Sequence, residues 1–262
     1  MVIGVVMSDI RQEKIASLLK LHGLIVREVR STIDLNDDLS IIILPVKGVN
    51  DEGLVKFKNS EISFKDYLDK ANKDLIIYCG VKCSYFDNYS FTVINLLDDE
   101  DVLEYNSKLT AQGLLIDLLS NIDMAVDEIK MDLIGFGHSG KAIYRMFSKL
   151  CPNIRIISKQ TMSDFEDFPV NIINYEDYKM LLDYPTIIIN TAPSLIIDSK
   201  ILKKLKHDTI ILDIASSPGG VDYDVARELG ITALLLPGLP SKYVSTSASR
   251  ILSEKIIKDV EK

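Results

Sequence analysis

The stretch from residue 129 to residue 145 constrains the fold of this chain most. It reads as an apolar strand, then Gly-Phe-Gly-His-Ser-Gly, then an amphipathic helix. This order is typical of a Rossmann dinucleotide site, in which the first glycine allows a tight turn, the second lets the backbone approach a pyrophosphate and the third lets the helix pack on the strand. The residues expected at the dinucleotide are Gly135, Gly137, His138, Ser139 and Gly140. An ordinary strand–turn–helix corner is the alternative interpretation.

Composition excludes several classes of protein. Apolar residues make up 47% of the 262 residues, which argues against disorder. The net charge of −8 is spread without a basic block, so a nucleic-acid groove is not expected. A membrane span and a signal peptide are not expected either, and the three cysteines are interpreted as reduced thiols in a cytoplasm. No histidine or second cysteine pair stands near Cys79 and Cys83 to complete a zinc site.

Apolar strand-like runs alternate with helical runs along most of the chain, which indicates parallel sheets covered by helices. The sequence therefore predicts an α/β protein of two domains, each with a parallel, helix-covered sheet. We expect an N-terminal α/β domain over 1–105 that binds substrate or a partner, and a doubly wound Rossmann domain over 106–245. A C-terminal helix over 246–262 is expected to pack back on the domain junction. A further helix is predicted to begin at Asn106 or Ser107 as N-cap.

The segment 158–161, Ser-Lys-Gln-Thr, follows the strand after the glycine-loop helix. An NAD site usually has an acidic residue about 20 residues beyond the glycines, which bonds the ribose hydroxyls. Here Ser158, Lys159 and Thr161 offer hydroxyls and a positive charge instead, and these suit the additional phosphate of NADP. We therefore expect NADP rather than NAD, with an ordinary surface lysine as the alternative for Lys159.

Three further strand ends carry residues that suit a ligand, because ligands in such sheets bind beyond the carboxyl ends of the strands. The small residues of 190–194 would allow close approach to the nicotinamide ribose. The segments 213–222 and 237–240 are rich in Ser, Pro and Gly, which lets the backbone come close to a bound group. Turns that only close the sheet are the alternative. The cofactor contacts expected here are Asn190, Thr191, Ala192 and Pro193.

Together these motifs resemble those of the A subunit of dipicolinate synthase. The specific part is the pair Ser-x-Pro-Gly-Gly-x-Asp, ending at Asp222, and Pro-Gly-Leu-Pro, ending at Pro240. The other matching stretches occur in the family's order and cover most of the chain. They are 9–12, 43–46, 105–113, 133–140 and 189–194.

The resemblance implies a two-domain fold like that of the formate/glycerate and alanine dehydrogenases. It also implies NADP-linked oxidation of a dihydrodipicolinate-type compound to pyridine-2,6-dicarboxylate in the mother cell of a sporulating bacterium. A flavoprotein-like B subunit is the implied partner, and a homo-oligomer is expected. Lys159 stands where the family has an arginine in its NADP-phosphate segment.

A small dicarboxylate substrate needs cationic or N–H partners. The expected substrate contacts are Arg11, Ser217, Gly219, Gly220, Pro237 and Gly238. The catalytic residue is left open, with Arg11, Asp213 and Ser217 as candidates, and no metal site is expected.

The segment 241–249 departs from the family pattern. Thr246 stands at the position of a family lysine, and Lys242 is the alternative source of a charge. This departure leaves two other functions open: a related reductase of another imine or 2-keto acid, and a non-catalytic dinucleotide-binding subunit.

Overall fold

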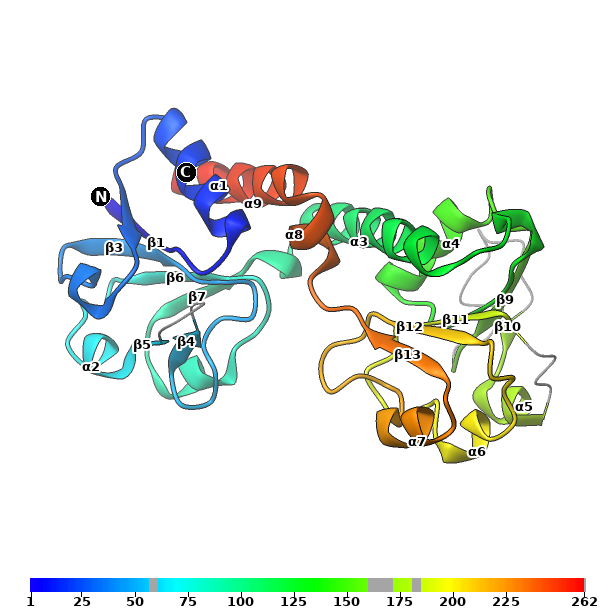
Figure 1. Cartoon of the computed structure of the whole chain (residues 1–262). Helices are drawn as coiled ribbons and strands as arrows, with labels where there is room; N and C mark the ends of the chain where they lie inside the picture. The colour runs from blue at the N-terminus through cyan, green and yellow to red at the C-terminus, as the bar shows by residue number, and fades with distance from the viewer. Residues whose placement is uncertain (57–60, 160–171, 181–184, 262) are drawn as a thin grey trace. The chain divides into compact units, whose positions relative to one another are not determined.

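The structure is a computed structural model that describes residues 1–56, 61–159, 172–180 and 185–261 (Figure 1). The chain divides into two compact units. Unit 1 comprises Met1–Asn106 together with Val244–Lys262, and unit 2 comprises Ser107–Tyr243. Each unit is built around a parallel sheet with helices, which confirms the predicted α/β fold class.

Among the described residues, the main sheet of unit 1 has five parallel strands in the order β2-β1-β3-β6-β7. Its strands are β1 Val2–Val6, β2 Val26–Val29, β3 Leu39–Ile43, β6 Ile76–Cys79 and β7 Thr92–Asn95. A small antiparallel pair is formed by β4 Leu54–Lys56 and β5 Glu61–Ser63. The short helices are α2 Lys65–Leu68, η1 Thr32–Asp34, η2 Ser84–Asn88 and η3 Leu96–Asp98.

Helices α1 Ile10–Leu21 and α9 Ser245–Val260 share one core in unit 1. Asp9 is the N-cap of α1 and accepts hydrogen bonds from the backbone N–H groups of Arg11 and Gln12. The apolar side chains of both helices are buried in a cluster with β1 and β3. They include Ile15, Leu19, Leu252 and Ile256. The C-terminal helix therefore completes the core of unit 1.

Helix α3 Glu100–Asn121 begins earlier than the sequence predicts. The predicted N-cap at Asn106 or Ser107 is wrong, because the helix continues through these positions. Val102 is buried in the core of unit 1, while Ser107 itself is 2% exposed. Burial of Val102 in the first turn thus stabilises a helix that begins before its predicted capping residues.

The sheet of unit 2 has six parallel strands among the described residues, in the order β10-β9-β8-β11-β12-β13. Its strands are β8 Lys130–Ile134, β9 Asn153–Ile157, β10 Ile172–Ile173, β11 Ile187–Asn190, β12 Ile210–Asp213 and β13 Thr232–Leu235. Its helices are α4 His138–Phe147, α5 Tyr175–Met180, α6 Ser199–Leu202, α7 Tyr223–Glu228, α8 Leu239–Tyr243 and η4 Val126–Glu128.

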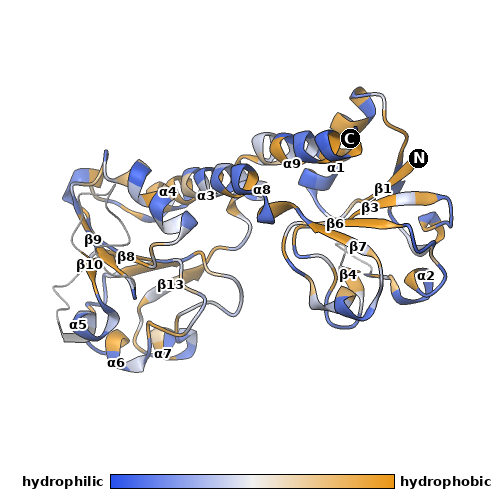
Figure 2. Cartoon of the chain, turned by 180° about the vertical axis from the view of Figure 1, so that it is seen from behind, coloured by the Kyte–Doolittle hydropathy of each residue, from blue (hydrophilic) through white to orange (hydrophobic). Residues whose placement is uncertain are grey.

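The central strands of unit 2 are buried on both faces, which explains their continuous apolar runs. In β11, Ile187 and Ile189 belong to one core cluster and Ile188 to the other. In Figure 2 the strands are mostly orange, the colour of hydrophobic residues, whereas the helices carry both orange and the blue of hydrophilic residues. Alternate side chains of β11 thus pack into the core on opposite faces of the sheet.

Candidate functional site

The carboxyl ends of the strands of unit 2 lie level with one another. In the register of the sheet, Ile134 pairs with Ile157 on one side and with Asn190 on the other. Asn190 pairs with Asp213, which in turn pairs with Leu235. The segments that follow these residues therefore lie along one edge of the sheet, where ligands of doubly wound sheets bind.

The glycine loop joins β8 to α4. Gly135 has a φ of +90°, a backbone conformation that favours glycine, and its N–H donates to the carbonyl of Ile157 at 2.8 Å. A Cβ atom on Gly135 would overlap the hydroxyl of Thr191, and one on Gly140 would overlap the carbonyl of Gly135. The first and third glycines are thus required by the packing of unit 2 itself.

Gly137 differs from the other two glycines. Its φ is −77°, which any residue adopts, and beyond its chain neighbours no atom of the described residues lies within 4 Å of the position that its Cβ would occupy. It is the N-cap of α4, and the first backbone bond into the helix runs from the N–H of Lys141 to its carbonyl at 2.9 Å. The earlier N–H groups of α4 have no intrahelical acceptor and can bind an anion. The open space beside Gly137 therefore fits a phosphate group.

His138 and Ser139 form the start of α4 beside this space. His138 is exposed and Ser139 is half-buried. Both stay predicted cofactor contacts.

The predicted NADP-phosphate segment follows β9. Ser158 is 3% exposed and lies in the edge of the sheet, where its N–H donates to the carbonyl of Ile173. Lys159 is exposed, and its ammonium lies 5.7 Å from the centre of the Tyr175 ring in α5. Thr161 lies outside the described residues. The exposed positive charge of Lys159 at a strand end is suited to a phosphate ligand.

The segment after β11 is held mainly by its own side chains. Asn190 is fully buried, donates to the carbonyl of Ala192 and to Asp213, and accepts from the N–H of Ala192. The hydroxyl of Thr191 donates to the carbonyl of Ile134 at 3.1 Å. Ala192 is half-buried and Pro193 is exposed. Asn190 and Thr191 thus shape the segment, and Ala192 and Pro193 are its accessible part.

The carboxylate of Asp213 joins two strand ends. It is 0% exposed and accepts from Asn190 Nδ2 at 2.9 Å and from the N–H of Ala215 at 3.0 Å through Oδ1. Through Oδ2 it accepts from the N–H of Gly220 and from the hydroxyl of Tyr223, both at 2.7 Å. A carboxylate offers about four acceptor positions, so this one is saturated. The arrangement fits a positioning role for Asp213 rather than the catalytic role considered from sequence.

Tyr223 is the residue of this network that sequence reasoning missed. It lies in the first turn of α7, and no spacing rule connects it to a strand end ten residues earlier. Burial and the hydrogen bond to Asp213 raise its pKa above the ordinary value of a tyrosine. It therefore stays protonated and donates to Asp213 at neutral pH.

The two glycines after β12 are needed by this network, and their substrate role stays a prediction. The N–H of Gly219 donates to the carbonyl of Ser216, and that of Gly220 donates to Asp213. A Cβ on Gly219 would lie 2.5 Å from Asp213 Oδ2, and one on Gly220 would lie 2.5 Å from Asn190 Nδ2. Both N–H groups thus have acceptors within the chain. Ser217, which precedes a cis peptide bond to Pro218, is exposed and stays a candidate.

The segment after β13 leads into a short helix that the sequence did not predict. Pro237 and Gly238 are exposed, whereas Leu239 begins α8 and is buried. A Cβ on Gly113 of α3 would lie 2.9 Å from the Cβ of Leu239. The glycine of the 105–113 motif is thus explained by close packing of α8 on α3.

Lys242, which the sequence offers as the alternative source of a charge in segment 241–249, is paired with a carboxylate of its own unit. Its ammonium donates to Asp117 Oδ1 at 3.1 Å, and the hydroxyl of Tyr243 donates to the same oxygen. These contacts hold α8 on α3 within unit 2.

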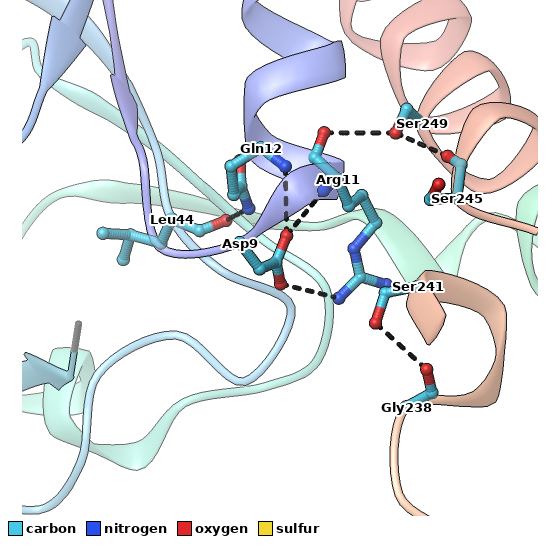
Figure 3. A network of polar contacts seen from close by, with 8 residues as sticks. All are labelled: Asp9, Arg11, Gln12, Leu44, Gly238, Ser241, Ser245 and Ser249. Atoms are coloured by element: carbon cyan, nitrogen blue, oxygen red, sulfur yellow. Dashed lines mark hydrogen bonds and ion pairs between the residues drawn. The ribbon is translucent and has the colours of Figure 1, made fainter. Parts of the chain in front are cut away.

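Arg11 lies in the first turn of α1, just beyond the end of β1, and belongs to unit 1 (Figure 3). It is 8% exposed, and burial lowers the pKa of its guanidinium although Asp9 is nearby. Its Nη2 lies 3.7 Å from Asp9 Oδ2, and its Nε has no hydrogen-bond partner among the described residues. A buried guanidinium with a vacant donor is suited to a carboxylate ligand. Arg11 thus stays a predicted substrate residue.

Within the described part of the chain, no group of three or more His, Cys, Asp or Glu side chains could hold a metal ion. None of the helices described is both long and apolar enough to cross a bilayer.

Comparison with known proteins adds the family. No family model matches the chain. Over 226 residues the chain is 30% identical to the A subunit of dipicolinate synthase from Bacillus subtilis strain 168, and the match covers 83% of this chain and 76% of that protein. The crystal structure of the dipicolinate synthase A chain from Bacillus subtilis has a TM-score of 0.84 at 26% identity, and covers 100% of this chain and 96% of that chain.

Two further solved structures share the fold. That of the A subunit of dipicolinate synthase from Bacillus halodurans has a TM-score of 0.87 at 24% identity, over 100% of this chain and 98% of that chain. NAD-dependent formate dehydrogenase from Staphylococcus aureus in complex with NAD has a TM-score of 0.64 at 11% identity, over 100% and 95%. At these identities both structures support the fold alone, whereas the A subunit from Bacillus subtilis confirms the resemblance seen in the motifs. The chain belongs to the family of the dipicolinate synthase A subunit.

Proposed function

We propose that this chain is an NADP-dependent oxidoreductase that oxidises a dihydrodipicolinate-type compound to dipicolinate, in the cytoplasm of the mother cell of a sporulating bacterium. The observation that carries the proposal is the open space beside Gly137, at the start of α4 and at the level edge of the sheet of unit 2. The membership of the chain in the family of the dipicolinate synthase A subunit supports the substrate. A flavoprotein-like B subunit is the proposed partner, and a homo-oligomer is the proposed assembly.

The residues of unit 2 fit a nicotinamide dinucleotide. The N–H groups at the start of α4 would bind the pyrophosphate, and Lys159 would bind the additional phosphate of NADP. The accessible Ala192 and Pro193 would lie against the nicotinamide ribose. The fold is shared with a formate dehydrogenase whose structure contains NAD, which supports this class of cofactor.

When bound, NADP⁺ supplies a hydride acceptor, so that a dihydropyridine loses a hydride and a proton and becomes aromatic. The chain then has to bind and orient the substrate and exclude competing reactions. Arg11 would bind a substrate carboxylate through its vacant Nε. Because aromatisation favours the oxidation, solvent can accept the proton, and the saturated Asp213 is not needed as a base.

The direct test supplies dihydrodipicolinate, generated from aspartate semialdehyde and pyruvate, with NADP⁺ and with or without a B subunit. Formation of dipicolinate in either condition supports the proposal. Failure in both, with NADP binding intact, favours a related reductase of another imine or 2-keto acid. If neither NADP nor NAD binds at millimolar concentration, both oxidoreductase functions are excluded. The alternative is then a non-catalytic subunit.

Exchange of Lys159 for aspartate is expected to reverse the preference for NADP over NAD. The new carboxylate would repel the additional phosphate and could bond the ribose hydroxyls of NAD, so we expect the ratio of NADP to NAD affinity to fall about 100-fold, or roughly 2.7 kcal/mol. Fluorescence titration with both cofactors measures this ratio. Lys200→Asp, at an exposed lysine of the same unit, is the matched control. An unchanged ratio in Lys159→Asp would show that this residue does not contact the phosphate.

A further inference from the structure

We propose that Lys14 and the first turn of α9 form, with Arg11, a binding site for substrate carboxylates in unit 1, and that Lys14 determines the preference for a dicarboxylate. The inference rests on the proposed function, because it names the groups that recognise the second carboxylate of that substrate.

Buried polar atoms without a partner gather at the start of α1. Among the described residues, the buried side-chain atoms that lack a hydrogen bond are Ser8 Oγ, Arg11 Nε, Gln12 Oε1 and Asp117 Oδ2. Three of these four lie within residues 8–12. Of these three, Ser8 Oγ and Arg11 Nε can donate to a carboxylate, whereas Gln12 Oε1 is an acceptor that a carboxylate does not satisfy. Because burial of an unsatisfied donor is unfavourable, the two donors indicate a site that an acceptor ligand completes.

The charge of Arg11 is only partly compensated in unit 1. Asp9 Oδ1 is engaged by the N–H groups of Arg11 and Gln12, at 2.8 and 3.1 Å. The other oxygen lies 3.7 Å from the guanidinium, longer than a charge-assisted hydrogen bond. A carboxylate ligand could therefore accept from Arg11 without displacing the N-cap.

Lys14 lies three residues after Arg11, so both side chains share a face of α1. Its ammonium donates to Ser245 Oγ at 2.8 Å and to Thr246 Oγ1 at 2.6 Å, in the first turn of α9. Both partners are neutral, and no carboxylate among the described residues lies within ion-pair distance of Lys14. Its positive charge is thus available to an anion beside α9.

The first turn of α9 adds further donors to the site. The helix has 16 residues, and its N-cap Val244 offers no side-chain cap to the first N–H groups. The helix dipole favours an anion at this end. The hydroxyl of Ser249, one turn further along α9, is shared between the carbonyl of Ser245 at 2.7 Å and that of Arg11 at 3.1 Å, so the start of α9 lies against the start of α1 (Figure 3). Unit 1 thus holds two cations three residues apart on α1, and the first turn of α9 contacts one of them, Lys14. This set of groups suits a ligand with two carboxylates.

The same contact bears on the departure of segment 241–249 from the family pattern. Thr246 stands at the position of a family lysine, and its hydroxyl binds the ammonium of Lys14. Lys14 of α1 therefore places a positive charge beside Thr246. The altered segment is compatible with a dicarboxylate substrate for this reason.

The test compares dipicolinate with picolinate, which has one carboxylate fewer, by calorimetric titration of the full chain in saturating NADPH. We expect wild type to favour dipicolinate, and Lys14→Met to lower dipicolinate affinity at least tenfold while picolinate affinity changes less than twofold. Lys14→Arg should restore most of the preference. Lys20→Met is the matched control, because Lys20 lies on the same helix and pairs with Glu28 at 2.6 Å.

Thr246→Asp serves if Lys14→Met does not fold. An acid at a helix start is tolerated, and it should repel the second carboxylate with the same tenfold loss. Unchanged dipicolinate affinity in a folded Lys14→Met or Thr246→Asp chain overturns the inference and leaves the proposed function standing. A wild-type chain that binds NADPH but prefers picolinate, or binds neither acid, overturns the dicarboxylate substrate and this site with it.

Discussion

Replacement of Gly137 by valine is expected to weaken NADP binding about 100-fold, or roughly 2.7 kcal/mol, while the folded structure is retained. The backbone at this position has a φ of −77°, and the described residues leave open space around the added Cβ. The cost to unit 2 is therefore limited to the poorer N-cap, about 1 kcal/mol. The isopropyl group would instead fill the space in which a pyrophosphate approaches the N–H groups of α4.

Gly140→Val is the control that separates binding from folding. Its Cβ would overlap the carbonyl of Gly135, so the helix could not pack on the loop and unit 2 should be destabilised. Under our assignment, Gly137→Val loses NADP affinity in the titration but keeps most of its thermal stability. Gly140→Val instead unfolds at a clearly lower temperature. If Gly137→Val binds NADP as tightly as wild type, the phosphate does not lie at this turn.

The glycine loop could be predicted from sequence because its roles depend on residues close to one another. Gly135 and Gly140 are separated by five positions, and the collision between them follows from one strand–turn–helix corner. The runs of apolar β-branched residues in β11 and β12 similarly predict strands that are buried on both faces. Most of the fold can therefore be predicted from the order of neighbouring motifs and from the pattern of apolar residues along the chain.

The connections between strand ends could not be predicted in this way. Asn190 and Asp213 are 23 residues apart, and their contact depends on the register that pairs them in the sheet. The sequence favours Gly220 as a substrate contact because the register is not visible in it. In the structure, the N–H of Gly220 donates to Asp213. A loop rich in Gly, Pro and Ser indicates close approach, but only the register shows whether a ligand or the chain itself approaches.

The start of α1 shows the same limit for charged residues. Arg11 is a candidate because of its place after the first strand, but the vacancy of its Nε depends on burial. Lys14 carries no signal in the sequence, because its partners Ser245 and Thr246 are more than 230 residues away.

Replacement of Asp213 by alanine is expected to lower the free energy of unfolding by about 3–5 kcal/mol. The change leaves Asn190, Gly220, Ala215 and Tyr223 without their shared acceptor at a site with 0% exposure. Chemical denaturation of the full chain measures this loss. Dinucleotide binding should weaken as well, because the segments after β11 and β12 lose the group that joins them.

Asp213→Asn distinguishes a positioning role from proton transfer. The amide keeps an acceptor for Asn190 and Ala215, but its NH₂ group faces the N–H of Gly220, so we expect an intermediate loss of about 1–2 kcal/mol. We expect activity to fall to an intermediate level, in line with the intermediate loss of stability, and the dependence of activity on pH to stay unchanged. Tyr223→Phe, which removes one donor and leaves the carboxylate, should retain most of the activity and stability. An Asn variant as stable as wild type but inactive would contradict this assignment, because a proton acceptor can be lost without cost to the fold whereas a saturated buried carboxylate cannot.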